Sequence, residues 1–283
     1  MKMRSVTSRK MTNFAVTIIA GSAAALGLFM LLWILLTITT RGIAAINWSF
    51  FTSMPTPPGS QGGGLANAIV GTIMITILAA VIGVPVGMLA GIYLAEFGQD
   101  SRFATTVRFV ANILMGAPSI VIGVFVYTLV VIPIGGFSGF AGSIALAIIM
   151  LPIITRTTED MLKLVPNSLR ESALALGAPE HKMIFQIVFR AAKSGLITGV
   201  MLAVARVSGE TAPLLFTTLN SPYWSLSMDK PMGNLTVTIF NYAMSPYADW
   251  QAKAWGASLL ITAGVLLMTL TARFIAKDRK ARR

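Results

Sequence analysis

Long runs without a charged residue restrict the fold of this 283-residue chain more than any other feature of its sequence. No Asp, Glu, Lys or Arg occurs in residues 11–40, 42–95, 109–155, 211–228 or 254–272. A helix needs about 20 apolar residues to cross a hydrocarbon core of about 30 Å, and most of these runs reach that length. Only 11% of all residues are charged, whereas soluble domains contain about 25%. The chain is therefore predicted to be a membrane protein.

The charge-free runs predict an all-α fold with six transmembrane helices. The expected spans are Phe14–Ile38, Asn67–Leu94, two helices within 109–155, Gly195–Phe216 and Ala254–Ile275. The two helices within 109–155 are expected to separate at residues 133–139, where proline and glycine disfavour a continuous helix. The apolar stretch after Lys10 is too long for a signal peptide, and no small-residue cleavage site follows it. It is interpreted as a retained membrane anchor.

The positions of the cations predict how these spans are oriented. Six crossings divide the chain into a basic N-terminus (1–13), a first helix (14–40), an outer loop (41–66), a five-helix core (67–276) containing an inner loop (163–193) and a second outer loop (217–253), and a basic tail (277–283). Of the 22 Lys and Arg residues, 18 lie in segments 1–13, 95–108, 156–193 and 273–283, all on the same side. Because Lys and Arg accumulate on the cytoplasmic side of membrane proteins, both termini are predicted to be cytoplasmic.

The composition also excludes several kinds of site. The chain has no Cys and one His, His181, which excludes disulfides, thiolate zinc sites, iron–sulfur clusters and histidine metal clusters. The glycines at 62–64 are not followed by a lysine, so no phosphate-binding P-loop exists, and hydrolase motifs are also absent. We expect no cofactor, no bound metal and no enzymatic activity. The net charge of +12 is explained by the cytoplasmic segments, so nucleic-acid binding is not needed to account for it.

Two charged residues inside a predicted span are the strongest functional signal. Arg206 and Glu210 lie within Gly195–Phe216, where a charge costs about 2.5–3.5 kcal/mol on insertion scales. Their i, i+4 spacing places them on one helical face, where they can pair. One interpretation is a structural ion pair, and the other is that both line a polar pathway or its gate. Arg156, near the cytoplasmic end of another span, is either an interfacial arginine or a third member of that pathway.

Three glycines follow one another at intervals of four in the second span. Gly83, Gly87 and Gly91 share one helical face. A face without side chains lets a neighbouring helix approach closely, so the pattern predicts a packing surface.

The inner loop contains signals for a helix, a turn and a second helix. Ser168 and Glu171 form a capping-box pattern that is expected to open the first helix. Gly177 is a typical C-terminal stop, and Pro179 fits the first turn of the second helix. We name residues 168–190 the knob. A rigid helical knob between two spans is suited to docking in a groove of a partner protein.

The sequence of the knob, RESALALGAPEHKMIFQIVF, resembles the EAA loop of ABC-importer permeases. Glu171 matches the first position of that pattern, Ala173 the third, Gly177 the seventh and Ile187 the seventeenth. Ser172 replaces the middle alanine, and Phe189-Arg190 stands where the pattern has Leu-Pro. The resemblance implies a type I ABC-importer permease fold and assigns these four positions to coupling with an ATPase.

A wider resemblance, from about Asn67 to Arg273, is to phosphate permeases of the PstA type. It is most specific at GETAPLL, residues 209–215. This resemblance implies transport of inorganic phosphate in the bacterial inner membrane, with Arg156, Arg206 and Glu210 at functional positions. It also implies four kinds of partner: a homologous second permease, an ATPase dimer, a periplasmic phosphate-binding protein and the lipid bilayer. A permease for another oxyanion, and a secondary transporter, channel or membrane-embedded enzyme, remain alternatives.

Overall fold

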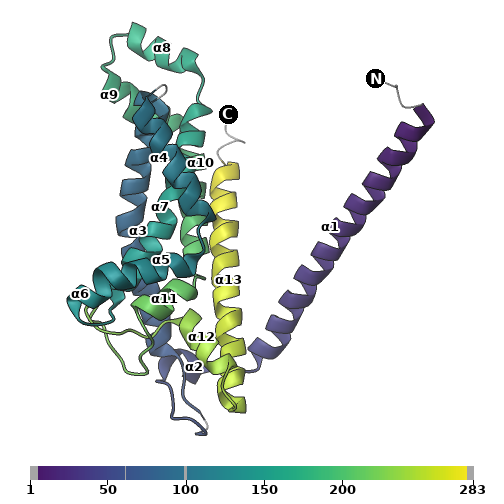
Figure 1. Cartoon of the computed structure of the whole chain (residues 1–283), viewed down its shortest axis with the longest axis vertical. Helices are drawn as coiled ribbons and strands as arrows, with labels where there is room; N and C mark the ends of the chain where they lie inside the picture. The colour runs from purple at the N-terminus through teal and green to yellow at the C-terminus, as the bar shows by residue number, and fades with distance from the viewer. Residues whose placement is uncertain (1–5, 61, 99–100, 279–283) are drawn as a thin grey trace.

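The computed structural model describes residues 6–60, 62–98 and 101–278, and all regular structure in these ranges is helical. The long helices are α1 (Val6–Ile43), α3 (Ala66–Ile92), α7 (Gly139–Lys163), α10 (Phe189–Val207) and α13 (Ala248–Asp278). The shorter α-helices are α2 (Trp48–Thr52), α4 (Arg102–Gly116), α5 (Ser119–Val126), α6 (Ile132–Ile134), α8 (Asn167–Ala175), α9 (Glu180–Lys182), α11 (Ala212–Thr217) and α12 (Leu235–Ala243). Three π-helical segments, η1 (Tyr93–Phe97), η2 (Tyr127–Val131) and η3 (Met183–Val188), complete the described elements. All except α1 assemble into an elongated bundle (Figure 1).

Five of these helical stretches are long and apolar enough to cross a membrane. Counting α4 and the stretch from α5 to α6 as one bent span gives a sixth crossing. The all-α, multi-pass membrane fold expected from the charge-free runs is therefore confirmed.

The third span differs from the expected straight helix within 109–155. It is bent by 105° between Gly116 and Ser119. Pro118 forces the preceding residue out of the helical region, and Ala117 is accordingly extended, with ψ 136°. Proline at 133, near the expected break, instead lies inside the short helix α6, and the chain turns at Gly135 in the left-handed conformation.

The centre of the bundle is formed by α3 and α7, which pack along most of their length. The predicted glycine face of α3 is the contact surface. A Cβ atom built on Gly83 would lie 3.3 Å from the carbonyl oxygen of Ala147, and one on Gly87 would lie 2.9 Å from Cβ of Ile154. Gly91 is packed still more tightly, because a Cβ atom built on it would lie 2.5 Å from Cβ of Thr158. The prediction that these glycines form a packing face is confirmed.

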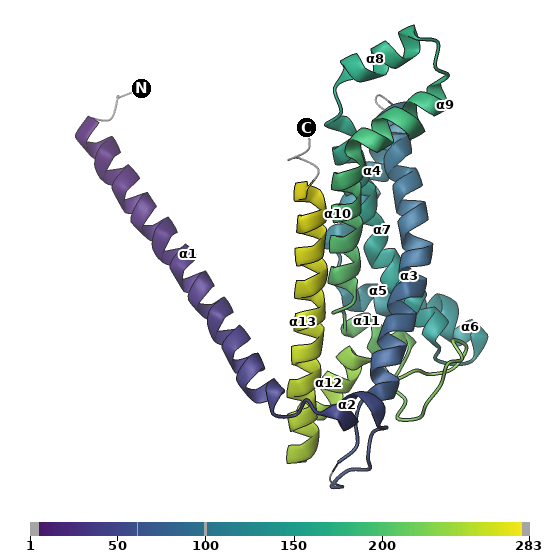
Figure 2. The same ribbon diagram turned by 180° about the vertical axis from the view of Figure 1, so that it is seen from behind.

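Helix α1 diverges from the bundle and leaves most of its apolar surface uncovered (Figures 1 and 2). It contacts the rest of the protein at its C-terminal end, where it packs against α13. Gly42 lies directly on Leu259, and the guanidinium of Arg41 lies 5.2 Å from the ring centroid of Trp255.

The end of the bundle opposite the knob is closed by polar and aromatic contacts. Lys253 is buried, pairs with Asp249 at 2.7 Å and donates to the carbonyl oxygen of Gly62, which ties the 53–64 loop to α13. Tyr242 stacks on Trp250 with ring centroids 4.3 Å apart. Burial and the nearby carboxylate of Asp249 raise the pKa of Tyr242 to about 12, so the phenol stays protonated.

The first turn of α1, the last described turn of α13 and the knob lie at the same end of the molecule (Figure 1). An even number of crossings produces this arrangement, in agreement with six spans.

Candidate functional site

Helix α10 ends in the middle of the bundle, inside the span expected at Gly195–Phe216. Its last residue is Val207, and a turn at Ser208 and Gly209 separates it from α11. The expectation of one continuous helix through Glu210 is therefore wrong. Helix α11 lies beside α5, and Gly123 of α5 packs directly on Pro213 (Figure 1). The interruptions of the third and fifth spans thus lie close to each other.

The ion pair expected between Arg206 and Glu210 is not formed. Arg206 belongs to the last turn of α10, whereas Glu210 lies beyond the helix end, so the i, i+4 geometry does not extend to it. The Arg206 side chain is exposed and has no ion-pair or hydrogen-bond partner among the described residues. The backbone carbonyl of Glu210 accepts a hydrogen bond of 2.9 Å from Oγ1 of Thr236, which fixes the turn against α12. Within residues 6–60, 62–98 and 101–278, Arg206 is consequently a cation without a paired carboxylate.

Arg156 belongs to a charged cluster that joins α4 and α7. At its centre Glu159 is fully buried, and its Oε1 accepts hydrogen bonds from Nε of Arg108 at 2.7 Å and from Nζ of Lys163 at 2.5 Å. The other carboxylate oxygen, Oε2, lies 3.6 Å from an Nη atom of Arg156 and forms no hydrogen bond. Arg156 also pairs with Asp160 at 3.2 Å, yet 47% of its side chain stays exposed. The guanidinium is thus held in place by two carboxylates and remains accessible.

Sequence reasoning missed Glu159 as part of this site. Arg156 and Glu159 are spaced i, i+3, and Glu159 and Lys163 are spaced i, i+4. This spacing could have predicted ion pairs along one helical face. Arg108 is 51 positions away and could not be placed from the sequence. The cluster contains three cations, Arg108, Arg156 and Lys163, and two acids, Glu159 and Asp160. Its net charge is therefore +1.

The knob projects from the bundle as two helical pieces around a turn (Figures 1 and 2). Gly177 has φ +79°, as expected for a helix stop. The capping box predicted at Ser168 and Glu171 is not formed, because α8 begins at Asn167 after Pro166 and has no side-chain cap. Glu171 is exposed and free to meet another protein.

Two of the four positions matched to the EAA pattern pack inward. Ala173 is buried with Leu162, Val165 and Ile184, and Ile187 packs against the same cluster. These two side chains hold the knob on the bundle; Ala173 is buried, and Ile187 is partly buried.

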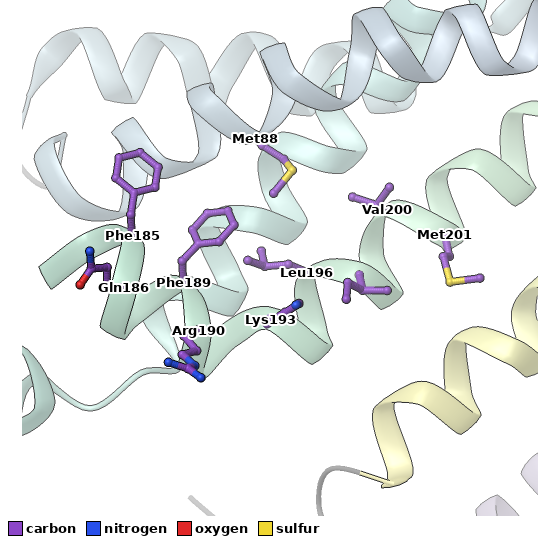
Figure 3. A pocket seen from close by; sticks show the side chains of 10 residues that line it. Met88, Phe185, Gln186, Phe189, Arg190, Lys193, Leu196, Val200 and Met201 are labelled. Carbon is purple, nitrogen blue, oxygen red and sulfur yellow. The ribbon is translucent and has the colours of Figure 1, made fainter. Parts of the chain in front are cut away.

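A pocket of about 710 Å³ opens between α3 and the start of α10 (Figure 3). Met88 of α3 and Phe189 of α10 face into it, and Arg190 and Lys193 lie along one edge (Figure 3). Its lining is mainly apolar, so it does not resemble a binding site for a hydrated oxyanion.

The bent and interrupted spans, the accessible cations between them and the projecting helical knob define a multi-pass membrane transport subunit. Residues 83–280 match the family model of the binding-protein-dependent transport system inner membrane component, and the chain belongs to this family. The phosphate transport system permease proteins PstA of Yersinia pestis and Haemophilus influenzae are both 51% identical to it. The alignments cover 96% of this chain and 92% of the Yersinia relative, and 90% of this chain and 90% of the Haemophilus relative.

Solved structures show the same fold at lower identity. A bacterial alginate ABC transporter chain matches with a TM-score of 0.66 at 12% identity, over 97% of this chain and 98% of the other. The inward-facing MetNI methionine ABC transporter matches with a TM-score of 0.62 at 20% identity, over 76% of this chain and 95% of the other. The relatives are named as permease proteins, which agrees with a transport subunit that is not itself an enzyme.

Proposed function

We propose that the chain is a membrane subunit of an ATP-driven importer of inorganic phosphate in the bacterial inner membrane. The observation that carries this proposal is the 51% identity to PstA of Yersinia pestis across nearly the whole chain. Its partners would be a homologous second permease, an ATPase dimer and a periplasmic phosphate-binding protein. The accumulation of 18 of 22 cations on one side supports cytoplasmic termini.

Arg206, Arg156 and Glu210 are proposed to line the pathway or its gate. A phosphate ion that leaves water loses solvation, and a guanidinium offsets this loss because its planar fork binds two oxygens at once. Arg206 is suited to this role because no side chain in the part of the chain that the structure describes neutralises it. Arg156 is suited to transient binding, because Glu159 and Asp160 already compete for its guanidinium.

The knob is proposed to receive the movement of the ATPase. Exposed Glu171 would meet the ATPase, Gly177 would shape the turn, and Ala173 and Ile187 would keep the knob attached to the bundle.

The proposal is tested by uptake of radiolabelled phosphate in cells that lack their own phosphate importers. The chain is expressed with the second permease, the ATPase and the binding protein, and each component is omitted in turn. We expect uptake only with all four, and no competition by sulfate or molybdate. Phosphate uptake that persists without the chain, or transport of sulfate in place of phosphate, contradicts the proposal.

A further inference from the structure

Arg170, in the first half of the knob, makes more polar contacts than any residue of the motif described above. Its Nη2 lies 2.7 Å from Oε1 of Glu96, and its Nε lies 3.1 Å from Oε2 of the same carboxylate. The same guanidinium donates to the carbonyl oxygens of Leu162, at 2.9 Å, and of Val165, at 2.5 Å. Only 15% of the Arg170 side chain and 6% of the Glu96 side chain are exposed. Arg170 is therefore bound to three parts of the chain at once.

These contacts connect the knob with the end of α3, to which the knob is not directly joined along the chain. Leu162 belongs to the last turn of α7, and Val165 follows that helix. Arg170 donates to the carbonyl of Val165 and adds a second donor to the carbonyl of Leu162, which also accepts from the N–H of Val165. The knob is joined covalently to α7 and α10. Glu96 lies in η1, the continuation of α3, and it is 74 positions away from Arg170 in the sequence. Any force that the knob exerts on α3 must therefore pass through non-covalent contacts.

Two kinds of contact are present between the knob and the end of α3. Ile92 and Ala95 pack in one apolar cluster with Ala173 and Ile184. Apolar contact is not directional, so surfaces of this kind can slide over each other. A two-point bond between a guanidinium and a carboxylate fixes both distance and orientation. Because both groups are largely buried, water screens this bond less than it would a surface pair.

We infer that the Arg170–Glu96 pair is the joint through which movement of the knob is transmitted to α3. Arg170 is a positioning residue, and the inference rests on the proposed coupling role of the knob. Since the glycine face of α3 is packed tightly on α7, and Arg170 also binds the end of α7, the joint moves these two helices together.

The decisive variant is Glu96→Gln. It removes the charge at the end of α3 with little change of shape, and it leaves the bonds from Arg170 to Leu162 and Val165 in place. The matched control is Arg102→Gln. Arg102 is an exposed cation at the same end of the molecule, and it has no ion pair among the described residues. The purified complex is reconstituted into liposomes, and three quantities are measured: the amount of bound ATPase, the rate of ATP hydrolysis and the phosphate taken up per ATP hydrolysed.

For Glu96→Gln we expect an assembled complex that hydrolyses ATP, with uptake per ATP reduced at least about fivefold, the lower end of typical coupling between sites. Arg102→Gln should keep the wild-type ratio. A wild-type ratio in Glu96→Gln at equal assembly overturns the inference. A purely structural pair would lower assembly but leave the ratio per assembled complex unchanged, and this result overturns it as well.

Restoring the connection chemically provides a second test. The chain contains no cysteine, so the double variant Glu96→Cys with Arg170→Cys can be joined by a thiol cross-linker about as long as the original pair. We expect low uptake per ATP before cross-linking and a recovery of at least about fivefold afterwards, mirroring the loss. No recovery in a fully cross-linked, assembled complex contradicts the inference.

A distance measurement separates failure of the joint from failure of the proposed function. Spin labels on Ser172→Cys in α8 and Phe97→Cys in η1 occupy exposed positions on the two sides of the joint. We expect one narrow distance distribution in the otherwise unchanged chain and a broad one when Glu96→Gln is added. If the unaltered complex takes up no phosphate, the phosphate proposal fails, while these distributions still decide whether the joint exists. An unchanged distribution rules it out.

Discussion

At the scale of single residues, Arg156 and Arg206 are held in different ways. Arg156 is shared between Glu159 and Asp160, and its positive charge is partly balanced within α7. Arg206 stands at the end of a helix that stops inside the bundle, with no partner among the described residues. A helix C-terminus also carries free carbonyl groups, whose partial negative charge stabilises a nearby cation. These carbonyl groups carry only partial charges and place no carboxylate on the guanidinium, so Arg206 is the better candidate to bind an anion.

Replacement of Arg206 tests this difference directly. Arg206→Gln should abolish phosphate uptake without lowering the amount of assembled complex, because no paired carboxylate is left behind. Arg206→Lys should retain part of the uptake, since lysine keeps the charge but loses the planar fork. Phosphate uptake normalised to complex in the membrane is the measurement.

Adding Glu210→Gln to Arg206→Gln tests whether the two residues depend on each other. Because the side chains of Arg206 and Glu210 do not pair, the double variant Arg206→Gln with Glu210→Gln should behave like Arg206→Gln alone. If Arg206→Gln lowers the protein level and Glu210→Gln restores both level and uptake, the two residues form a structural pair after all and the pathway role is wrong.

At the scale of helices, the close contact between α3 and α7 depends on the lack of a side chain at Gly83, Gly87 and Gly91. A Cβ on Gly91 would lie 2.5 Å from Cβ of Thr158 and 2.7 Å from the carbonyl oxygen of Thr155. The corresponding approach at Gly83 is 3.3 Å, which a slight shift can relieve. The tightest approach is therefore at the end of α3 nearest the knob.

Gly91→Ala should consequently destabilise the protein more than Gly83→Ala. Excess volume in a packed interior costs about 1–3 kcal/mol, and we expect Gly91→Ala in that range and Gly83→Ala below it. Thermal unfolding of both variants in detergent measures the order. Equal midpoints for the two variants would mean that the helices separate easily and that the glycine face is not a close contact.

The turn of the knob depends on the backbone conformation of Gly177. Its φ of +79° costs other residues about 1–2 kcal/mol, and asparagine less than most. Gly177→Val should therefore distort the turn and reduce co-purification of the ATPase, whereas Gly177→Asn should retain most of it. Membrane insertion should be normal in both variants. Full ATPase recovery with Gly177→Val would exclude a role of this turn in docking.

Physical reasons explain which elements could be predicted from the sequence. The spans were recognisable because each is a long segment without charge. The glycine face of α3 was recognisable because its glycines recur every four residues. The 105° bend at Pro118 was not predicted, because the uncharged run continues through it and a proline alone does not determine how far a helix bends. The end of α10 was missed because apolar residues resume at Pro213, Leu214 and Leu215, so the segment was predicted as one span through Glu210, and the true environment of Arg206 was missed with it. The Arg108–Glu159 and Arg170–Glu96 pairs join residues 51 and 74 positions apart and depend on tertiary packing.

At the scale of the whole molecule, the first turn of α1, the last described turn of α13 and the knob lie at the same end (Figure 1). The opposite end carries the 53–64 loop, tied to α13 by Lys253, and the exposed side chains of Tyr223 and Trp224. The two ends differ strongly in cation content, which is the basis for assigning the knob to the cytoplasm.

Cysteine accessibility tests this orientation, and the absence of native cysteines makes every signal specific. Ser60→Cys and Ser227→Cys, both exposed at the end opposite the knob, should react with a membrane-impermeant thiol reagent in intact cells. Ser168→Cys and Ser172→Cys, exposed on α8, should react only after the cells are permeabilised. The permeabilised sample is prepared without the ATPase, because a docked ATPase would itself protect α8. Since the first turn of α1 and the last described turn of α13 lie at the knob end, labelling of Ser168→Cys from outside would invert the orientation of the whole molecule. It would also place the knob where no ATPase can reach it.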